Sequence, residues 1–437
     1  MDASFRRFRD VPELMRDGPE VLMRIQRAHG DRVRIRIGIE DFLLISDVAD
    51  ARHVLVTHAN GYAKSEHYRG LKAALGRGLV TSEGALWRRQ RKLVQPAFRP
   101  AAIEALAPTM TECAAAMLDG WRAEGEASFD VHEAMMAVTF QIAGRTLFGQ
   151  DLSRETGPVT EAFEVALAFA NDYAESLLPL PLWAPLPRYR AFRRAMATLD
   201  SALAAVIDEK RGASGDDLLG AMIHATDEDG QMSVRQLRDE AMTLLAAGHE
   251  TTAVALSWTF WWLAQHPAIA DAVSEEARRV LGDDLPDATI VRELPLTGRV
   301  LHEAMRLRPP VWIVERQPYL DDALPSGVRI PAGSIVGISP WVLHRHAAHW
   351  TNPEGFDPER FTEERSAGRD RYAYLPFGAG PRVCIGGSFA MVEATILLAM
   401  IAREWRLSLL SGQRVHYRPG ITLRPTPGIQ MRRTHVG

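Results

Sequence analysis

The stretch FGAGPRVCIGG (Phe377–Gly387) places Cys384, one of only two cysteines in 437 residues, among four glycines. A helical pattern, FAMVEATILLAMIA, begins just after it, so the sulfur is expected near a helix N-terminus, where negative charge is favoured. A cysteine ligand acts as a thiolate, which N–H donors and nearby cations stabilise, and glycine lets the backbone approach a flat cofactor closely. The stretch therefore favours a ligand cysteine over a small buried hydrophobic residue, which is how Cys113 in TECAAAML is interpreted.

The composition is that of an ordinary globular protein, with 46% hydrophobic and 24% charged residues and a net charge of −4. This charge gives no general affinity for nucleic acid or anionic membrane. Two cysteines cannot build a disulfide framework or a four-cysteine zinc site. The N-terminus lacks the features of a secretory signal, and the apolar segment Ala253–Ala264 is too short to span a bilayer. We therefore expect a cytoplasmic protein without a membrane anchor.

The pattern along the chain predicts a mainly α fold with a smaller β region. Residues 32–47 alternate as a β-hairpin with one buried face does, and residues 48–307 are mostly helical. A capping box at Ser233 and Gln236 starts a long helix that is expected to end at Gln265. Short strands are expected after Pro309. No linker divides residues 1–437, which favours one domain. The loop LLPLPLWAPLP (Leu177–Pro187) is either a tight connector or an apolar lip beside a substrate entrance.

The long helix carries polar residues where its pattern is otherwise apolar. In AAGHETTA (Ala246–Ala253), Gly248 costs about 1 kcal/mol relative to alanine, which suggests a local distortion around a bound group. Glu250 beside the hydroxyl of Thr251 could deliver protons into a dry pocket. A zinc motif is excluded because Ala253 stands where H-E-x-x-H requires histidine.

Three further motifs are less specific. In HEAMR, Glu303 and Arg306 are three residues apart on one helix face, and we expect a partly buried structural ion pair. In WRRQRKLVQPAF, Trp87 and Arg91 share a face that could hold an anion, although a solvated basic helix is the commoner case. The HRHAAHW histidines are interpreted as structural rather than metal-binding; they are His344, His346 and His349.

Together these motifs resemble the cytochrome P450 family of haem-thiolate monooxygenases. FGAGPRVCIG is similar to its cysteine-ligand signature, AGHETT to its oxygen-activation motif, EAMR to its E-x-x-R motif, and FDPERF to the segment that completes the E-x-x-R network. They occur in the family's order and, with the hairpin, cover nearly the whole chain. The resemblance implies the cytochrome P450 fold, with a long central helix over a haem.

The resemblance also implies roles for particular residues. Cys384 would be the axial ligand of haem b iron, with Phe377 shielding its sulfur and Gly378 and Gly386 in the signature loop. A thiolate ligand favours O–O cleavage. Glu250 and Thr251 would deliver protons. The haem propionates would be held by Trp87, Arg91, Arg316 and Arg382, and Arg360 would join Glu303 and Arg306.

The implied reaction inserts one atom of O2 into a C–H bond of a hydrophobic molecule such as a fatty acid, terpenoid, steroid or polyketide, with two external electrons. Only 53 residues follow Cys384 (437 minus 384), so we expect a separate ferredoxin or flavodoxin, docking near Arg88, Arg89 and Lys92, and a monomeric enzyme. The residues expected to line the pocket are Leu245, Ala246, Val311, Ile313, Val314, Thr422 and Leu423. A cysteine hydrolase, a haem-binding sensor and a haem-thiolate isomerase, dehydratase or peroxygenase remain alternatives.

Overall fold

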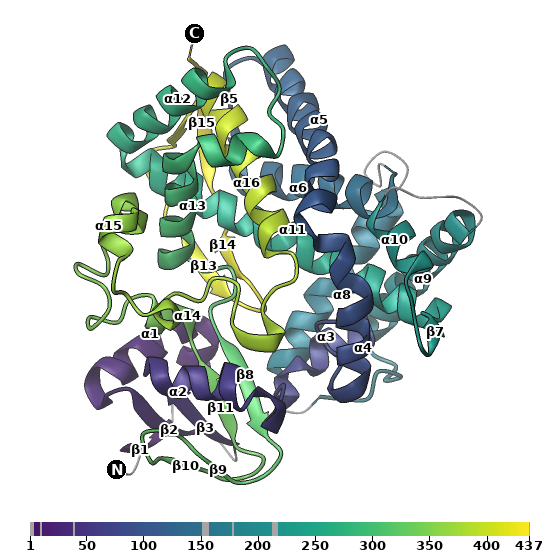
Figure 1. The fold of residues 1–437 in the computed structure, drawn as a ribbon, viewed down its shortest axis with the longest axis vertical. Helices are drawn as coiled ribbons and strands as arrows, with labels where there is room; N and C mark the ends of the chain where they lie inside the picture. Colours follow the sequence, from purple (N-terminus) through teal and green to yellow (C-terminus); the bar gives the residue numbers. More distant parts are fainter. Residues whose placement is uncertain are drawn as a thin grey trace.

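The computed structural model describes residues 4–8, 11–37, 40–150, 157–176, 179–211 and 217–436. Helices form most of this structure, and the largest sheet lies below them in Figure 1. The prediction of a mainly α fold with a smaller β region is confirmed. The helices are α1 (Val11–His29), α2 (Val48–Arg52), α3 (Arg69–Leu75), α4 (Gly84–Val94), α5 (Pro100–Glu124), α6 (Val131–Phe148), α8 (Gly157–Glu175), α9 (Pro187–Arg211), α10 (Leu218–His224), α11 (Val234–Gln265), α12 (Pro267–Leu281), α13 (Pro295–Leu307), α14 (Pro340–Leu343), α15 (Glu363–Ser366) and α16 (Gly387–Glu404).

The largest sheet has the strand order β1-β2-β3-β11-β8-β4. The predicted hairpin is formed by β2 and β3, which pair antiparallel with Val33 opposite Leu44, while its turn at residues 38–39 lies outside the described residues. In β2, arginines alternate with Val33 and Ile35, which are buried, so one face of the strand contributes to the core. The strands are β1 (Ser4–Phe8), β2 (Arg32–Ile37), β3 (Glu40–Ile45), β4 (Tyr62–Ala63), β8 (Val314–Pro318) and β11 (Ile335–Ile338).

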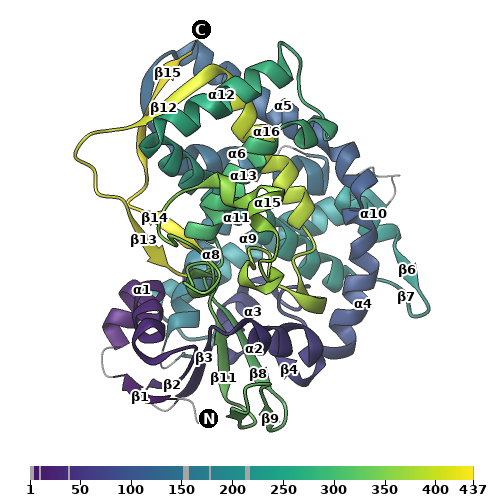
Figure 2. The same ribbon diagram turned by 60° about the vertical axis from the view of Figure 1, so that its left-hand side comes forward.

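Shorter β elements lie around the helices (Figure 2). A three-stranded sheet brings together β5, β12 and β15, and three two-stranded ribbons pair β6 with β7, β9 with β10 and β13 with β14. Their bounds are β5 (Ala127–Asp130), β6 (Thr226–Asp227), β7 (Gly230–Gln231), β9 (Asp322–Ala323), β10 (Arg329–Ile330), β12 (Trp405–Leu409), β13 (His416–Pro419), β14 (Leu423–Thr426) and β15 (Gln430–His435).

Helix α11 runs through the centre of the molecule and packs along α6 (Figure 1). Its N-cap is Ser233, whose hydroxyl accepts a hydrogen bond from the Gln236 amide at 3.3 Å, and the Gln236 side chain accepts one from the Ser233 amide at 2.9 Å. The helix ends at Gln265, where Pro267 follows. The predicted start, capping box and end are therefore confirmed.

A buried ion-pair network joins α13 to the segment that leads toward Cys384. Both oxygens of Glu303 accept hydrogen bonds from Arg306, at 2.7 and 2.8 Å, and Arg360 donates to Glu303 at 3.2 Å. Arg306 also donates to the carbonyl oxygens of His344, Pro353 and Gly355. Since Glu303 and Arg306 have no exposed surface, the network fixes residues 344–360 against α13.

Arg306→Met is expected to lower the free energy of unfolding by about 3–5 kcal/mol, because it leaves a buried carboxylate with half of its cationic partners. Urea unfolding of the haem-loaded protein measures this loss. The control is Arg365→Met, which removes an exposed ion pair with Asp357 and should cost less than about 1 kcal/mol. Equal losses in the two variants would contradict the structural role of the network.

Candidate active site

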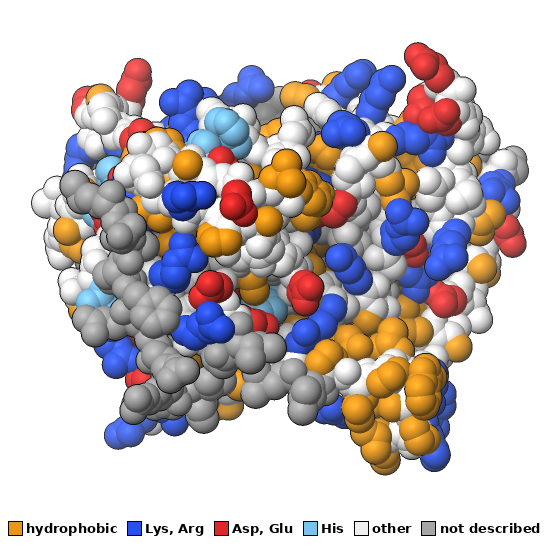
Figure 3. Space-filling model, turned by 90° about the horizontal axis from the view of Figure 1, so that it is seen from below, with side chains coloured by type: hydrophobic (Ala, Val, Ile, Leu, Met, Phe, Trp, Pro, Cys, Tyr) orange, Lys and Arg blue, Asp and Glu red, His pale blue; other side chains and the backbone are white. Residues whose placement is uncertain are grey.

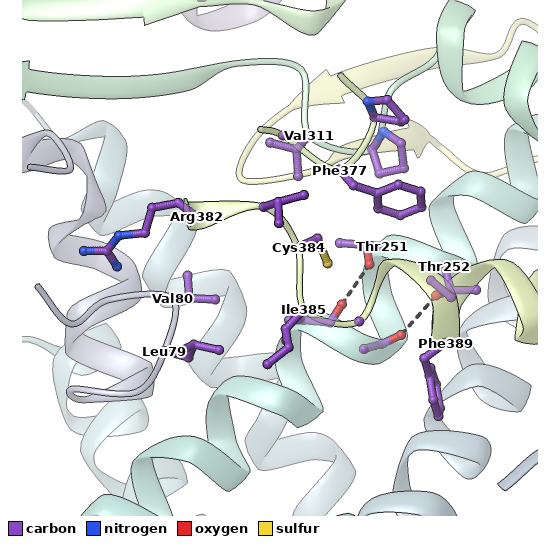
Figure 4. Close-up of a pocket in the computed structure, with 18 of the residues that line it drawn as sticks. Leu79, Val80, Thr251, Thr252, Val311, Phe377, Arg382, Cys384, Ile385 and Phe389 are labelled. Carbon is purple, nitrogen blue, oxygen red and sulfur yellow. Dashed lines mark hydrogen bonds between the residues drawn. The ribbon is translucent and has the colours of Figure 1, made fainter. Parts of the chain in front are cut away.

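A cavity of about 330 Å³ lies between α11 and the loop that carries Cys384. Figure 4 shows that the side chains facing it come from both ends of the sequence, with Leu79 and Val80 on one side and Phe377 and Phe389 on another. Its walls are mostly hydrophobic. The polar groups come from several parts of the chain, including the cysteine loop, α4, β8, residues 64 and 68 and one face of α11.

The cysteine loop directs Cys384 into this cavity (Figure 4). The Cys384 amide donates to the carbonyl oxygen of Phe377 at 2.9 Å, which closes the loop. Gly380 has φ +68°, and a Cβ there would lie 2.0 Å from the Leu55 carbonyl oxygen, so this position requires glycine. Gly386 is the N-cap residue of α16, and Gly378 also has a positive φ.

The Cys384 side chain is accessible from the cavity. Burial raises the pKa of its thiol above the usual value of 9.0, while the Gly386 amide and the charge of Arg91 act in the opposite direction. A bound metal ion deprotonates a coordinating thiol, so these two groups are placed to stabilise the thiolate once metal binds.

The four residues expected to hold carboxylates all line the cavity. The guanidinium of Arg382 lies 3.9 Å from the Trp87 ring centroid, donates to the Ser82 carbonyl at 2.9 Å and pairs with Glu83. Arg91 donates to the Val383 carbonyl at 2.9 Å, which joins α4 to the cysteine loop, and Arg316 is largely buried on β8. The positive side chains therefore converge from three separate segments of the chain.

Two further polar residues, Lys64 and Tyr68, line the same part of the cavity and were missed from the sequence. The Lys64 amine lies 4.0 Å from Glu83. Burial and the nearby charge of Arg382 lower the pKa of Lys64 to about 7. YAKSEHY contains no recognisable motif, and only the fold brings this lysine beside the arginines.

The acid and the hydroxyl of AGHETT point in different directions. The Thr251 hydroxyl reaches the cavity and donates to the Ala247 carbonyl oxygen at 2.7 Å (Figure 4). Glu250 is buried outside the cavity and accepts hydrogen bonds from Thr422 and, at 2.6 Å, from Arg424. Burial raises the pKa of Glu250, but its bonds to Arg424 and Thr422 lower it more, which favours the ionised carboxylate. The local distortion expected around Gly248 does not interrupt α11, which is continuous from Val234 to Gln265.

Thr252 also lines the cavity, and a second buried acid, Glu393 on α16, lies near it. The Thr252 hydroxyl donates to the Gly248 carbonyl at 3.1 Å (Figure 4), and both carboxyl oxygens of Glu393 are buried without a hydrogen-bond partner among the described residues. Burial raises the pKa of Glu393 well above its usual value of 4.5, which favours the neutral carboxylic acid. In the sequence, the only sign that Glu393 is unusual is that it lies within an otherwise apolar helical segment.

The structure corrects most of the expected pocket lining. Val311 and Val314 line the cavity, but the α11 face is turned by one residue from the prediction. Its lining residues follow the helical period and are Thr243, Leu244, Ala247, Gly248, Thr251, Thr252 and Ala255. The other predicted residues lie elsewhere: Leu245 and Ala246 pack in the main core, Ile313 and Leu423 pack against the sheet, and Thr422 bonds Glu250.

The structure also changes the interpretation of two surface motifs. Arg89 is bound by Asp227 and by the Gly230 carbonyl, so only Arg88 and Lys92 remain exposed in the expected docking patch. Two of the three histidines of HRHAAHW have structural partners: His344 accepts from the Leu375 amide and His346 bonds Asp31, each at 2.8 Å.

Comparison with known proteins agrees with this geometry. The family model for cytochrome P450 matches residues 11–432. Cyclooctatin synthase of Streptomyces melanosporofaciens is 38% identical, over 92% of this chain and 88% of its own length. Pentalenene oxygenase of Streptomyces avermitilis is 32% identical, over 87% and 85%. The crystal structure of the cytochrome P450DA heme domain has a TM-score of 0.91 and 26% identity, covering 100% of this chain and 98% of that one.

The chain therefore belongs to the cytochrome P450 family, and it is an oxidoreductase of the monooxygenase class. The family cofactor is haem, iron protoporphyrin IX, held by a cysteine thiolate. Three observations show that the cavity fits haem. The Cys384 thiol, which has no disulfide partner, faces the cavity. Cationic side chains and Trp87 lie together at one wall, where they could bind the haem carboxylates, and the remaining walls are apolar.

Glu393→Gln is expected to stabilise the protein more at about pH 8 than at about pH 5. The folded pKa of Glu393 is raised above its unfolded value near 4.5, so above that pH the unfolded chain releases a proton that the folded protein retains. The stability that depends on this proton is present at low pH and is lost as pH rises; glutamine has no such dependence. Urea midpoints at the two pH values measure the difference, with the exposed Glu364→Gln as control. An equal change at both pH values would show that Glu393 is ionised in the fold.

Proposed function

We propose that the enzyme oxidises a C–H bond of an apolar, terpenoid-like substrate, with two electrons from a separate ferredoxin or flavodoxin, and that residues 1–437 form one catalytic domain. The observation that carries the proposal is a single cavity with Cys384 and cationic groups at one wall and Thr251 among apolar side chains at another. The printed names of similar proteins, cyclooctatin synthase, pentalenene oxygenase and cyclooctat-9-en-7-ol 5-monooxygenase, support the terpenoid class over fatty acids, steroids and polyketides.

Each residue has a distinct task in this proposal. Bound haem supplies the oxygen-activating chemistry, with Cys384 as its thiolate ligand. Arg91, Arg316 and Arg382, with Trp87, hold the haem carboxylates, and Lys64 adds an amine on the same side. Leu244, Val311 and neighbouring apolar side chains exclude water and orient the substrate.

Proton delivery is assigned to Thr251, with Glu250 as the acid behind it. Thr251 holds a hydroxyl proton at the cavity wall, and Glu250, the preceding residue, is bound by Arg424, whose side chain is 37% exposed. Movement of Arg424 toward solvent would free Glu250 to take up a proton. This arrangement favours reductant-driven oxidation, which needs protons delivered in step with electrons, over a peroxygenase, isomerase or dehydratase.

The electron donor is assigned to the side of α4. Arg91 fastens α4 to the cysteine loop, and Arg88 and Lys92 on the same helix are exposed. An acidic donor docked against them would lie near Cys384, and its association would weaken as salt increases.

Cys384→Ala is expected to abolish the strongly red-shifted Soret band that reduced, carbon monoxide-treated protein shows, because no other cysteine faces the cavity in the described structure. Absorption spectra with and without carbon monoxide measure this loss. Cys113→Ala, which alters the buried cysteine of the core, should retain the band. A colourless wild-type protein from haem-replete cells would overturn the proposal and leave Cys384 to be tested as a hydrolase nucleophile.

Thr251→Ala is expected to uncouple reductant consumption from product formation by about tenfold or more and to release hydrogen peroxide. A terpenoid that shifts the haem spin state is first selected from a panel with fatty acids and steroids; binding of a fatty acid but no terpenoid would contradict the proposed substrate class. Coupling is then measured as product formed per reductant consumed. Thr251→Ser should restore it, and Thr259→Ala, which removes a buried hydroxyl from the same helix outside the cavity, should leave it unchanged. Unaltered coupling in Thr251→Ala would refute the assignment.

A further inference from the structure

The loop between α8 and α9 exposes an unusual amount of hydrophobic surface. Trp183 is 75% exposed, Leu180 44% and Leu186 40%, and Pro181 and Pro185 are exposed beside them. Viewed from below, hydrophobic side chains gather in a projecting lobe at this side of the molecule, with basic side chains at its margins (Figure 3). We call residues 179–186 the apolar lobe. Tryptophan is rarely left so open to water unless its surface meets a partner.

The apolar lobe does not serve the cavity directly, since none of residues 179–186 lines it. The alternative of a lip beside the substrate entrance therefore gains no support from these residues. Its backbone is nevertheless held firmly: Arg193 donates to the Leu182 carbonyl at 2.7 Å and to the Ala184 carbonyl at 3.2 Å, and the Tyr173 hydroxyl donates to the Leu180 carbonyl at 3.1 Å. The fold keeps the hydrophobic side chains outward instead of letting the loop collapse onto the surface.

The first turns of α9 add a concentrated positive charge. Residues 179–199 contain four arginines and no acidic residue, although the whole chain has a net charge of −4. Arg188, Arg190 and Arg194 are exposed and, within the described part of the chain, form no ion pair, while Tyr189, Phe192 and Ala195 fasten the opposite helix face to the core. The arginines are therefore available to an external anion beside the apolar lobe.

We propose that the apolar lobe and the exposed arginines of α9 dock the enzyme on an anionic lipid bilayer surface. A convex loop tipped by tryptophan and leucine suits the boundary between headgroups and acyl chains, where tryptophan is favoured. Arginines at its margin match the negative potential of anionic lipids, each contributing about a fivefold gain in partitioning. The contact is interfacial: no described helix has the length and hydropathy to cross a bilayer.

The surface contact adds to the proposed function without depending on it. Helix α8, which leads into the lobe, is tied to the wall of the cavity, because Arg69 donates to the carbonyl oxygens of Tyr173 and Ala174 near its end, and the neighbouring Tyr68 lines the cavity. An enzyme docked in this way would lie against a phase in which apolar substrates concentrate.

The experiment is co-sedimentation of the haem-loaded protein with phosphatidylcholine vesicles that contain or lack phosphatidylglycerol, at low and high salt. We expect binding to the anionic vesicles that weakens as salt increases. Arg188→Gln with Arg190→Gln should lower it by about twenty-five-fold, and Trp183→Ser with Leu186→Ser by about tenfold or more. Haem absorbance and thermal midpoint confirm that each variant is folded.

The matched controls are Leu285→Ser and Arg279→Gln, which change an exposed leucine and an exposed arginine at and just beyond α12, near the top of Figure 1. Both should bind vesicles as the wild type does. Absence of wild-type binding, or equal losses in lobe and control variants, would overturn the proposal. Sedimentation velocity tests another outcome. If the wild type does not bind vesicles but forms a dimer that Trp183→Ser dissociates, the proposal is overturned, because the lobe is then an interface between two copies of the chain.

Discussion

The buried carboxylate of Glu303 is the constraint on which the position of the cysteine loop depends. It has no exposed surface, and Arg306 and Arg360 both donate to it. Because an unpaired charge is costly in the interior, the three side chains must assemble together, and Arg306 then binds the carbonyl oxygens of residues 344, 353 and 355. A segment with little regular structure thus acquires a defined path toward Phe377 and Cys384.

The cavity that results separates charge from apolar surface. Arg382, Arg316 and Lys64 lie close enough for their charges to oppose one another: burial is the main cause of the lowered pKa of Lys64, and the charges of Arg382 and Arg316 lower it further. Carboxylates placed there would relieve the repulsion. Along α11 the only cavity-facing polar groups are threonine hydroxyls, and those of Thr251 and Thr252 are satisfied by the helix's own carbonyls. Such a wall accepts an apolar molecule without leaving a charge unsolvated.

The parts of the site that were predicted from sequence are those whose chemistry is local. Cys384 in its glycine loop, Glu303 with Arg306 and the capping box of α11 each lie within a few residues of their partners. Lys64 and Tyr68 could not be predicted from the sequence, because only the tertiary fold brings them close to Arg382. The expected lining at Leu245 and Ala246 failed for a different reason: an apolar helix that is buried on nearly every side gives no contrast between its core face and its cavity face.

The periodicity of the α-helix explains why Glu250 and Thr251, although adjacent, lie in different surroundings. Neighbouring residues on a helix point about 100° apart, and the face of α11 that lines the cavity, which includes Thr251 and Thr252, leaves Glu250 on another side. Thr251 occupies the cavity face, and Glu250 is left facing β14, where Thr422 and Arg424 bind it. An ionised acid next to the pocket would attract water and counter-ions into it, whereas an acid held by a half-exposed arginine can exchange protons with solvent without opening the apolar wall. The β14 ribbon, far from α11 in the sequence, therefore belongs to the functional site.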